Sequence, residues 1–377
     1  MKIIGVVIEA NPLHHGHEYF LNKIKKDNPN CLIIGIVSSY FTMRGDLNCL
    51  SKKEKVTEML TSGFDLVFEL PIGLALHRAD IFASNAVNIL KILGITDLAF
   101  GCETANVEEI LKVVEIVNLD EFKEKFGENI TQVGYKNAYV QALSNFVDED
   151  LVKLSTNPNF TLALYYLDTL KNTNINPIVI NRRGSYNEEK PTSSITSATA
   201  VRNLLYNKEE TSEYTSFNNY LDYFEVNKKF FDIVKFNLIV QNKRLPYDEE
   251  GIGNYIANTG DFSLEYPDFI KKLSNKKYTK TRIRRYLINL VLDNTLPTST
   301  KTAYLRLLGF TENGINYIKE LPKYKKEMIF SSPNTNLSEE IKQHLELELK
   351  GARIYGIIGN IDIIDEYKFP IKYQKEK

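Results

Sequence analysis

The sequence predicts an α/β fold, in which a Rossmann-like domain with a parallel sheet is followed by a mainly α-helical C-terminal domain. Two observations lead to this prediction. Over the first half, short apolar runs rich in β-branched residues alternate with helical patterns, as in right-handed βαβ units. Beyond residue 224, apolar residues recur at helical spacing and strand-like runs are rare. A length of 377 residues suggests two domains, and we place them at 1–215 and 216–377, divided in a polar, acidic stretch.

Each predicted strand is an apolar run of the kind found in strands that are covered on both faces. The first four are IIGVVI at Ile3–Ile8, LIIGIV at Leu32–Val37, LVFEL at Leu66–Leu70 and ITDLAF at Ile95–Phe100. A fifth strand is expected at Pro177–Asn181. Together these runs predict a doubly wound sheet within the first 210 residues.

The intervening segments carry helix signals. A helix is expected at His17–Ile24, and Ser51 with Glu54 has the spacing of a capping box. A third helix at Asp80–Leu93 should end at Gly94. Further helices are expected at Leu162–Leu170, Thr199–Leu205, Phe230–Val240, Tyr266–Leu273, Arg282–Leu292 and Ala303–Leu308. The segment Ala352–Asp362 fits either a strand or a packed tail.

Composition excludes several classes of protein. The chain has 47 Lys and Arg against 48 Asp and Glu, with 43 % hydrophobic residues, which is ordinary for a globular protein. It has no apolar run long enough to span a membrane, so we expect no membrane partner. The three cysteines, Cys31, Cys49 and Cys102, form neither a CxxC site nor a disulfide scaffold and fit a reducing cytoplasm. The balanced charge neither supports nor excludes a nucleic-acid partner.

A phosphate-binding pattern follows the first strand. Ligands of open parallel sheets bind beyond the carboxyl ends of the strands, and here the chain reads Glu9-Ala-Asn-Pro-Leu-His-His-Gly-His17. A helix that begins near Gly16 would offer free N–H groups to an anion. His14 and His17 would add imidazole donors where charge develops on a phosphoryl group. Metal binding or ordinary surface histidines are the alternatives, although no H-E-x-x-H pattern is present.

Two later segments suit anions as well. Ser193–Arg202, read as SSITSATAVR, places hydroxyl groups and Arg202 at the start of a helix, which suits phosphate binding, and a plain helix cap is the alternative. Lys276–Arg285 holds six cations and no acid, which suits an RNA backbone. A solvated basic face is the alternative for this helix, whose Ile283 and Leu287 should be buried.

These motifs resemble the HxGH nucleotidyltransferase superfamily, which includes class I aminoacyl-tRNA synthetases and pantetheine-phosphate adenylyltransferases. Longer matches narrow the resemblance to the bacterial tRNA(Met) cytidine acetate ligase family. They are Gly5–His17, Arg44-Gly45-Asp46, Glu69-Leu70-Pro71, Phe100–Glu103, Pro158-Asn159, Arg182 with Gly184, and Lys277–Arg285.

The resemblance implies a two-step, ATP-dependent reaction. Acetate would attack the ATP α-phosphate, giving acetyl-adenylate and pyrophosphate, with His14 and His17 as the catalytic residues. The acetyl group would then pass to N4 of the wobble cytidine of elongator tRNA(Met), leaving N4-acetylcytidine. Mg²⁺ would accompany ATP, but no pattern fixes its ligands. The alternatives are an adenylyltransferase acting on a small phosphorylated metabolite and a non-catalytic RNA-binding protein.

The resemblance also implies binding residues. ATP would contact Val7, Ile8, Glu9, Ala10, Asn11, Pro12, Leu13, His14, His15, Gly16, His17, Glu18, Tyr19, Phe20, Gly101, Asn159, Arg182, Ser197, Thr199 and Arg202. The tRNA would contact Lys276, Lys277, Lys280, Arg282, Arg284 and Arg285. Tyr40 and Phe41 could stack on the target base or belong to the core.

Overall fold

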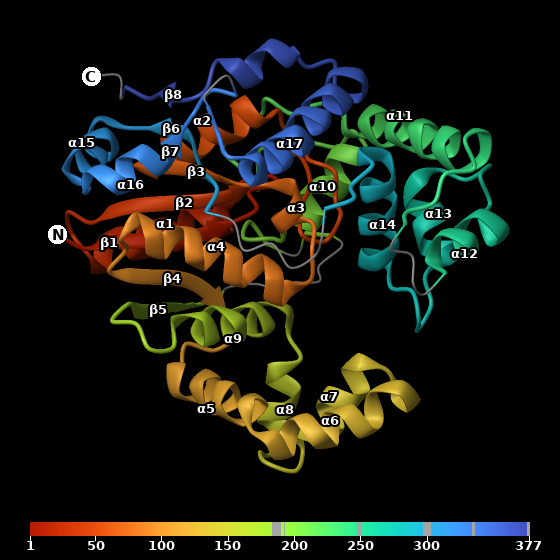
Figure 1. Cartoon of the computed structure of the whole chain (residues 1–377), viewed down its shortest axis with the longest axis horizontal. Helices are drawn as coiled ribbons and strands as arrows, with labels where there is room; N and C mark the ends of the chain where they lie inside the picture. The colour runs from red at the N-terminus through yellow and green to blue at the C-terminus, as the bar shows by residue number, and fades with distance from the viewer. Residues whose placement is uncertain (183–189, 192, 247–250, 297–302, 334–335, 375–377) are drawn as a thin grey trace.

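The computed structural model describes residues 1–182, 190–191, 193–246, 251–296, 303–333 and 336–374. Its centre is an eight-stranded sheet with the order β5-β4-β1-β2-β3-β6-β7, in which β8 also pairs with β6 (Figure 1). The strands are β1 Ile3–Ile8, β2 Leu32–Ser38, β3 Leu66–Leu70, β4 Asp97–Cys102, β5 Asn176–Asn181, β6 Leu305–Phe310, β7 Ile329–Phe330 and β8 Ile371–Lys372. The five strands of the N-terminal half pair in parallel, which confirms the predicted fold class.

Helices cover both faces of this sheet. Those before residue 210 are α1 His15–Asp27, α2 Lys52–Ser62, α3 Ile72–Ala75, α4 Ala79–Leu93, α5 Val107–Asn118, α6 Asp120–Val133, α7 Tyr135–Leu143, α8 Glu149–Ser155, α9 Pro158–Leu170 and α10 Ala198–Tyr206. Side chains of β2 alternate between the two layers, as the strand period requires. Ile34 and Ile36 pack with residues of α4 and α9, whereas Ile33 and Val37 pack with residues of α1 and α2.

The second half is mainly helical, as predicted. It contains α11 Tyr223–Lys235, a π-helix η1 Phe236–Val240, α12 Ile252–Thr259, α13 Tyr266–Leu273, α14 Lys280–Leu292, α15 Glu312–Glu320, α16 Lys323–Met328, α17 Glu339–Ile358 and a 3₁₀ helix η2 Ile363–Tyr367. None of the helices in the described ranges is long and apolar enough to cross a membrane. The division into domains at residue 215 remains a prediction.

The core of this helical part includes residues of the N-terminal half. Tyr40 and Phe41 are 3 % and 1 % exposed and belong to the same apolar cluster as α11, α13, α14 and α17. The ring of Phe41 packs against Phe230 and Tyr355. Both aromatic residues are therefore core residues and cannot stack on an RNA base.

One predicted helix near the C-terminus was wrong, and the structure settles one segment that the sequence left open. The segment predicted as a helix at Ala303–Leu308 forms strand β6, which pairs antiparallel with β3. Its Arg306 is fully buried because it forms ion pairs with carboxylates of β3 and η2. The segment that begins at Ala352, expected to be either a strand or a packed tail, packs as the last part of α17, where Ala352 and Tyr355 are buried against the helical core.

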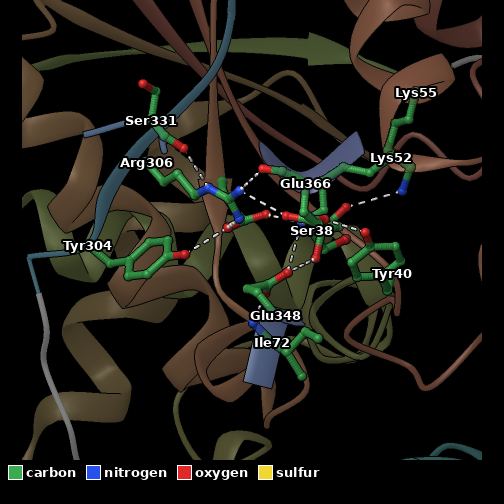
Figure 2. A network of polar contacts seen from close by, with 12 residues as sticks. Ser38, Tyr40, Lys52, Lys55, Ile72, Tyr304, Arg306, Ser331, Glu348 and Glu366 are labelled. Carbon is green, nitrogen blue, oxygen red and sulfur yellow. Dashed lines mark hydrogen bonds and ion pairs between the residues drawn. The ribbon is translucent and has the colours of Figure 1, made fainter. Parts of the chain in front are cut away.

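A buried ionic network joins β6 and the C-terminal helices to the N-terminal half (Figure 2). Lys52 Nζ lies 2.6 Å from Glu69 Oε1, 2.6 Å from Glu366 Oε1 and 3.2 Å from Glu348 Oε2. Arg306 lies 3.1 Å from Glu69 Oε2 and 2.8 Å from Glu366 Oε2. These side chains are at most 2 % exposed. Because the network has three carboxyl groups and two cations, one carboxyl group is expected to be protonated.

Glu348 is that group, and its titration predicts a pH effect on stability. Burial, and then the charge of Glu69, raise its pKa to about 8, although Lys52 opposes the shift. The folded state therefore binds a proton that the unfolded state releases near pH 4.5. As pH rises from about 4.5 to 8, wild type should lose about 1.4 kcal/mol per pH unit relative to Glu348→Gln, which has no proton to lose. Urea unfolding at several pH values measures this difference.

The control for this prediction is Glu346→Gln, which alters an exposed carboxylate of the same helix. This variant should follow the wild-type pH dependence. If Glu348→Gln also followed it, Glu348 would be ionised in the folded protein and the proposed proton would be absent.

Candidate active site

A cavity of about 210 Å³ lies beyond the carboxyl ends of β1 and β4. These strands are neighbours, yet the chain leaves β1 toward β2 and leaves β4 toward β5, on the opposite side. The cavity therefore lies at the topological switch point of the sheet, where doubly wound folds bind nucleotides. The predicted residues that line it are Val7, Ile8, Glu9, Ala10, Asn11, His14, Gly16, His17, Tyr19, Phe20, Gly101, Asn159, Arg182, Ser197, Thr199 and Arg202.

Four residues of the predicted ATP loop do not line the cavity. Leu13 is fully buried in the apolar cluster beneath the sheet, and Pro12 follows a cis peptide bond. His15 and Glu18 pair with each other across one turn of α1, 4.0 Å apart. Gly184, part of a motif quoted above, lies outside the described residues.

His14 and His17 cap α1 reciprocally, and this capping fixes their tautomers. His14 Nδ1 accepts from Gly16 N–H at 3.1 Å, and His17 Nδ1 accepts from His14 N–H at 3.3 Å. Because both Nδ1 atoms are acceptors, a neutral ring must carry its proton on Nε2. The two rings lie together, with centroids 4.0 Å apart, and both line the cavity.

Both imidazoles are neutral at physiological pH. Burial, and then the charges of His17, Arg182 and Arg202, hold the pKa of His14 well below its usual value. Burial, followed by Arg182, lowers the pKa of His17 to about 3. The pair can therefore donate hydrogen bonds from Nε2 to an anion without itself being charged.

The expectation of free amides at the start of α1 was wrong. The N–H of His15 donates to Tyr214 O at 3.0 Å, and that of Gly16 donates to His14. The next N–H groups bond to His14 O. Tyr214 thus satisfies the first amide, and His14 satisfies the others through its side chain and its carbonyl group. An anion here would be bound by side chains, assisted by the helix dipole.

Gly16 and Gly101 leave room for side chains of the site. A Cβ atom on Gly16 would lie 2.8 Å from His14 Cε1, and one on Gly101 would lie 3.2 Å from Arg182 Cγ. Gly16 thus admits the His14 ring in its capping position, which is a different role from direct backbone approach to phosphate. Larger residues at either position would displace a side chain of the cavity wall.

Glu103 orients Arg182 through Asn159. Its carboxylate accepts from the N–H groups of Asn159 and Phe160 at the start of α9, at 3.2 and 2.8 Å, and from Asn159 Nδ2 at 2.7 Å. Asn159 Oδ1 then accepts from Arg182 Nη1 at 3.0 Å. The sequence motif Phe100–Glu103 includes Glu103 but did not predict this orienting role. Its place directly after β4 was the signal that could have marked it.

The Ser-Ala-Thr segment both caps α10 and fixes the loop after β1. Ser197 Oγ accepts from Ala200 N–H at 3.1 Å. Arg202 donates to Asn11 O at 2.6 Å and to Thr199 Oγ1 at 3.2 Å. Arg202 therefore connects α10 to the residues just before the two histidines.

The turn after β2 also lines the cavity, and sequence reasoning gave it no role. Thr42, Met43, Arg44 and Asp46 belong to the lining. Met43 N–H donates to Glu9 Oε1 at 2.5 Å. The signal was available, because this turn follows the strand next to β1 and contains the quoted Arg-Gly-Asp motif. Apolar lining residues Phe82, Phe100, Leu162 and Tyr166, from α4, β4 and α9, were missed as well.

A buried lysine supports the ends of β1 and β2 from below. Lys55 of α2 is 0 % exposed, and its Nζ donates to Glu9 O at 2.9 Å. It also donates to Ser38 O at 3.1 Å (Figure 2). Burial lowers the pKa of Lys55 to about 7. These two carbonyl groups lie at the ends of β1 and β2, where the chain leaves each strand and enters the segments that line the cavity.

The predicted RNA-binding cations divide into two groups. Lys276, Lys277 and Lys280 are exposed at the start of α14, beside the partly exposed Arg282. Lys277 and Arg282 both lie over the ring of Tyr278, at 4.9 and 5.5 Å. As predicted, Ile283, Leu287 and Leu290 are buried on one face of α14.

Arg284 and Arg285 point toward the N-terminal half instead. Arg284 Nη1 lies 2.5 Å from Asp46 Oδ1, and Arg285 Nη1 donates to His77 O at 2.7 Å. Burial lowers the pKa of Arg285 to about 10. These two arginines hold α14 against the cavity wall.

Within the described ranges, no group of three or more His, Cys, Asp or Glu side chains could hold a metal ion. The lining carboxylate of Asp46 is already paired with Arg202 and Arg284. The lining residues therefore do not form a resident metal site.

The doubly wound sheet, with the histidine pair at its switch point and an arginine-containing helix start opposite, defines an α/β nucleotidyltransferase. The sequence model of the HIGH Nucleotidyl Transferase family matches residues 1–366. The tRNA(Met) cytidine acetate ligase of Clostridium novyi is 30 % identical over 388 residues, covering 95 % of this chain and 96 % of the relative. The chain therefore belongs to the tRNA(Met) cytidine acetate ligase family of HIGH nucleotidyltransferases.

Solved structures share the fold. The apo crystal structure of Thermotoga maritima TmcAL superposes with a TM-score of 0.84 at 24 % identity, covering 99 % of both chains. A second structure of that protein, bound with alpha-thio ATP, gives a TM-score of 0.82 at the same identity and coverage. The whole arrangement, including the helical second half, is thus common to the two proteins.

Proposed function

We propose that this protein is an ATP-dependent acetate ligase that forms N4-acetylcytidine at the wobble position of elongator tRNA(Met). Its membership of the tRNA(Met) cytidine acetate ligase family is the observation that carries the proposal. The histidine pair at the switch-point cavity supports it, because activation of a carboxylate by ATP needs donors at the α-phosphate.

In the first step, a carboxylate oxygen of acetate attacks the α-phosphorus of ATP, and the bond to the β-phosphate oxygen breaks. Acetyl-adenylate and pyrophosphate result. Acetate is already a nucleophile at neutral pH, so this step needs positioning and charge stabilisation rather than a base. The Nε2–H groups of His14 and His17 would donate to the α-phosphate oxygens as their negative charge increases.

In the second step, N4 of the cytidine attacks the acetyl carbonyl carbon. The bond to the AMP oxygen breaks, AMP leaves, and the attacking nitrogen loses a proton. The base must leave its stack to expose N4. Buried Tyr40 and Phe41 do not serve as its stacking platform.

The remaining lining residues suit the rest of ATP. Arg182, held by Asn159, would bind phosphate or the adenylate, while Ser197 and Thr199 would steady the departing pyrophosphate. Arg202 would act mainly by fixing Asn11, since its guanidinium already bonds Asn11 O and Thr199. Mg²⁺ would arrive with ATP, held by its phosphates and water, because the lining carboxylates Glu9 and Asp46 already bond Met43 N–H and two arginines and form no cluster of three ligands in the described part of the chain.

The RNA surface that we propose is the exposed segment that leads into α14 together with the first turn of that helix, and it is formed by Lys276, Lys277, Lys280 and Arg282. Its positive charge would bind the tRNA backbone, while Arg284 and Arg285 hold the helix in place. Lys277→Ala with Arg282→Ala should weaken tRNA binding and lower the slope of log affinity against log salt by about 2, for two lost phosphate contacts. Filter binding across a salt series measures both quantities.

A matched control is Lys228→Ala with Lys229→Ala, which removes two exposed lysines from α11. This pair should leave the salt slope unchanged. An equal reduction in both double variants would place the RNA elsewhere or show only a general charge effect.

The decisive experiment incubates the protein with ATP, isotopically labelled acetate and elongator tRNA(Met), followed by mass analysis of the nucleosides. Labelled N4-acetylcytidine is expected, together with AMP and pyrophosphate. Pyrophosphate release that is indifferent to acetate, with no labelled nucleoside, would overturn the proposal and favour an adenylyltransferase acting on another substrate.

A further inference from the structure

The turn after β2 holds one carboxylate in a fixed position. Thr42 N–H donates to Asp46 O at 3.0 Å, and Asp46 N–H donates to Thr42 Oγ1 at 2.9 Å. Gly45, with φ of 76°, closes the turn by donating its N–H to Thr42 O at 2.9 Å. The side chain of Asp46 is only 10 % exposed. Its orientation is therefore set by the turn.

The Asp46 carboxylate bridges two arginines from distant parts of the chain. Its Oδ2 lies 3.0 Å from Arg202 Nη2, and its Oδ1 lies 2.5 Å from Arg284 Nη1. Arg202 belongs to α10 and lines the ATP cavity. Arg284 belongs to α14, whose first turn carries part of the proposed RNA surface. Burial raises the pKa of Asp46, but Arg202, Arg284 and Arg44 together lower it below its usual value, so the bridge is ionic.

Close packing makes this bridge stiff. A Cβ atom on Gly45 would lie 2.7 Å from Arg284 Cβ and 2.8 Å from the backbone nitrogen of Arg285. On the other side, Arg202 bonds Asn11 O, and Asn11 Nδ2 donates to Leu47 O at 2.9 Å. A displacement of α14 must therefore move the turn, Arg202 or the loop that precedes the histidines.

We propose that Asp46 is a positioning residue that couples the RNA-binding helix to the ATP cavity, so that bound tRNA and bound ATP strengthen each other's binding. The inference rests on the proposed function in taking α14 as the RNA-binding helix. tRNA bound to the first turn of α14 restrains the helix, and the bridge passes this restraint to Arg202 and Asn11. Because the bridge is stiff, the position that α14 takes with tRNA bound also sets the position of the cavity wall, and ATP binds more tightly to the wall in this position. Linkage requires ATP to tighten tRNA binding by the same factor.

Calorimetry with a non-hydrolysable ATP analogue, with and without saturating elongator tRNA(Met), tests the coupling. In wild type, tRNA should lower the Kd of the analogue by about fivefold or more. Asp46→Asn and Arg284→Met should reduce this factor to about one, whereas Asp268→Asn, at an exposed acid of α13, should retain it. Asp46→Asn should also weaken binding without tRNA, because Arg202 loses its anchor. Arg284→Met keeps the test valid if Asp46→Asn does not fold.

Two results would overturn the inference. One is a wild-type Kd that tRNA does not change, and the other is a wild-type coupling factor in Arg284→Met. The assay measures binding alone, so it is separate from the chemistry. Coupling in a protein that makes no labelled N4-acetylcytidine would contradict the proposed reaction and leave the role of Asp46 standing.

Discussion

His17→Ala should reduce acetate-dependent exchange between ATP and pyrophosphate by about 10²–10³-fold, as expected when one transition-state donor is removed. His14→Ala should have an effect at least as large, since His14 is the N-cap residue of α1 and its side chain accepts from Gly16 N–H. The reason is the fixed tautomer of each ring. Nδ1 is occupied by a backbone N–H, so Nε2–H is the group that reaches the cavity. Isotope exchange measures the rate, and tRNA affinity should change little.

Two substitutions at position 17 separate the donor from the cap. Asn places its polar atoms near Nδ1, whereas Gln extends an amide toward the position of Nε2. If donation from Nε2 matters, His17→Gln should retain more exchange than His17→Asn. His15→Ala, which removes a ring outside the cavity, serves as the control. Full exchange in His14→Ala or His17→Ala would show that the site has been assigned wrongly.

Neutral rings also predict the pH profile of this exchange. Because the pKa of His17 is about 3, lowering the pH from 8 to 6 should not protonate the ring. Titration of His17 should therefore cause no change in the exchange rate between pH 8 and pH 6. A transition near pH 6.5 that disappears in His17→Gln would contradict a neutral donor.

The second large effect is expected on stability. Arg306→Met should lower the free energy of unfolding by about 3–5 kcal/mol, because it leaves buried carboxylates without their partner. Glu69 and Glu366 would then share Lys52 alone. Burial would raise the pKa of Glu69, but Lys52 and Arg306 lower it to about 2, so the loss of Arg306 leaves a charge that is costly to bury.

Urea unfolding of wild type and Arg306→Met measures this loss, with Arg353→Met, at an exposed position of α17, as the control. Glu69→Gln combined with Arg306→Met should cost less than the sum of the single changes, since the uncompensated charge is gone. Arg306→Lys, which keeps a cation, provides a second comparison if Arg306→Met does not fold. Equal free energies of unfolding for wild type and Arg306→Met would contradict this prediction, because the packing of Met would then fully compensate for the lost ion pairs.

The elements that the sequence predicted best are those whose burial depends on local pattern. β1 and β3 begin and end at the predicted residues, because mainly apolar runs, interrupted in β3 only by Glu69, fit strands covered on both faces. Ser51 caps α2 by accepting from Glu54 N–H, and Gly94 ends α4 with φ of 83°, as expected. In these cases the local residues carry the whole physical reason.

Strand β6 was missed because its environment is not local. LRLLGF has an arginine between leucines, which fits a helix as well as a strand. Arg306 is buried only because Glu69 and Glu366 lie elsewhere in the chain to pair with it. No pattern within six residues could indicate this pairing.

The site shows the same division. The loop after β1 and the Ser-Ala-Thr segment reach one cavity as expected, because strand order and motif position were enough to bring them together. Two other contacts, the hydrogen bond from His15 N–H to Tyr214 O and the ion pair of Arg284 with Asp46, depend on how distant parts of the chain pack together. Such contacts follow from tertiary structure and leave no mark in sequence spacing.

The pairing of β3 with β6 has a consequence for synthesis on the ribosome. Leu66, Val67 and Phe68 are fully buried, and the strand that covers their edge is made some 240 residues later. Until then, a nascent chain presents an apolar strand with unpaired backbone groups, which invites association with other chains. We therefore expect the growing polypeptide to need protection by a chaperone until β6 has been synthesised and can pair with β3.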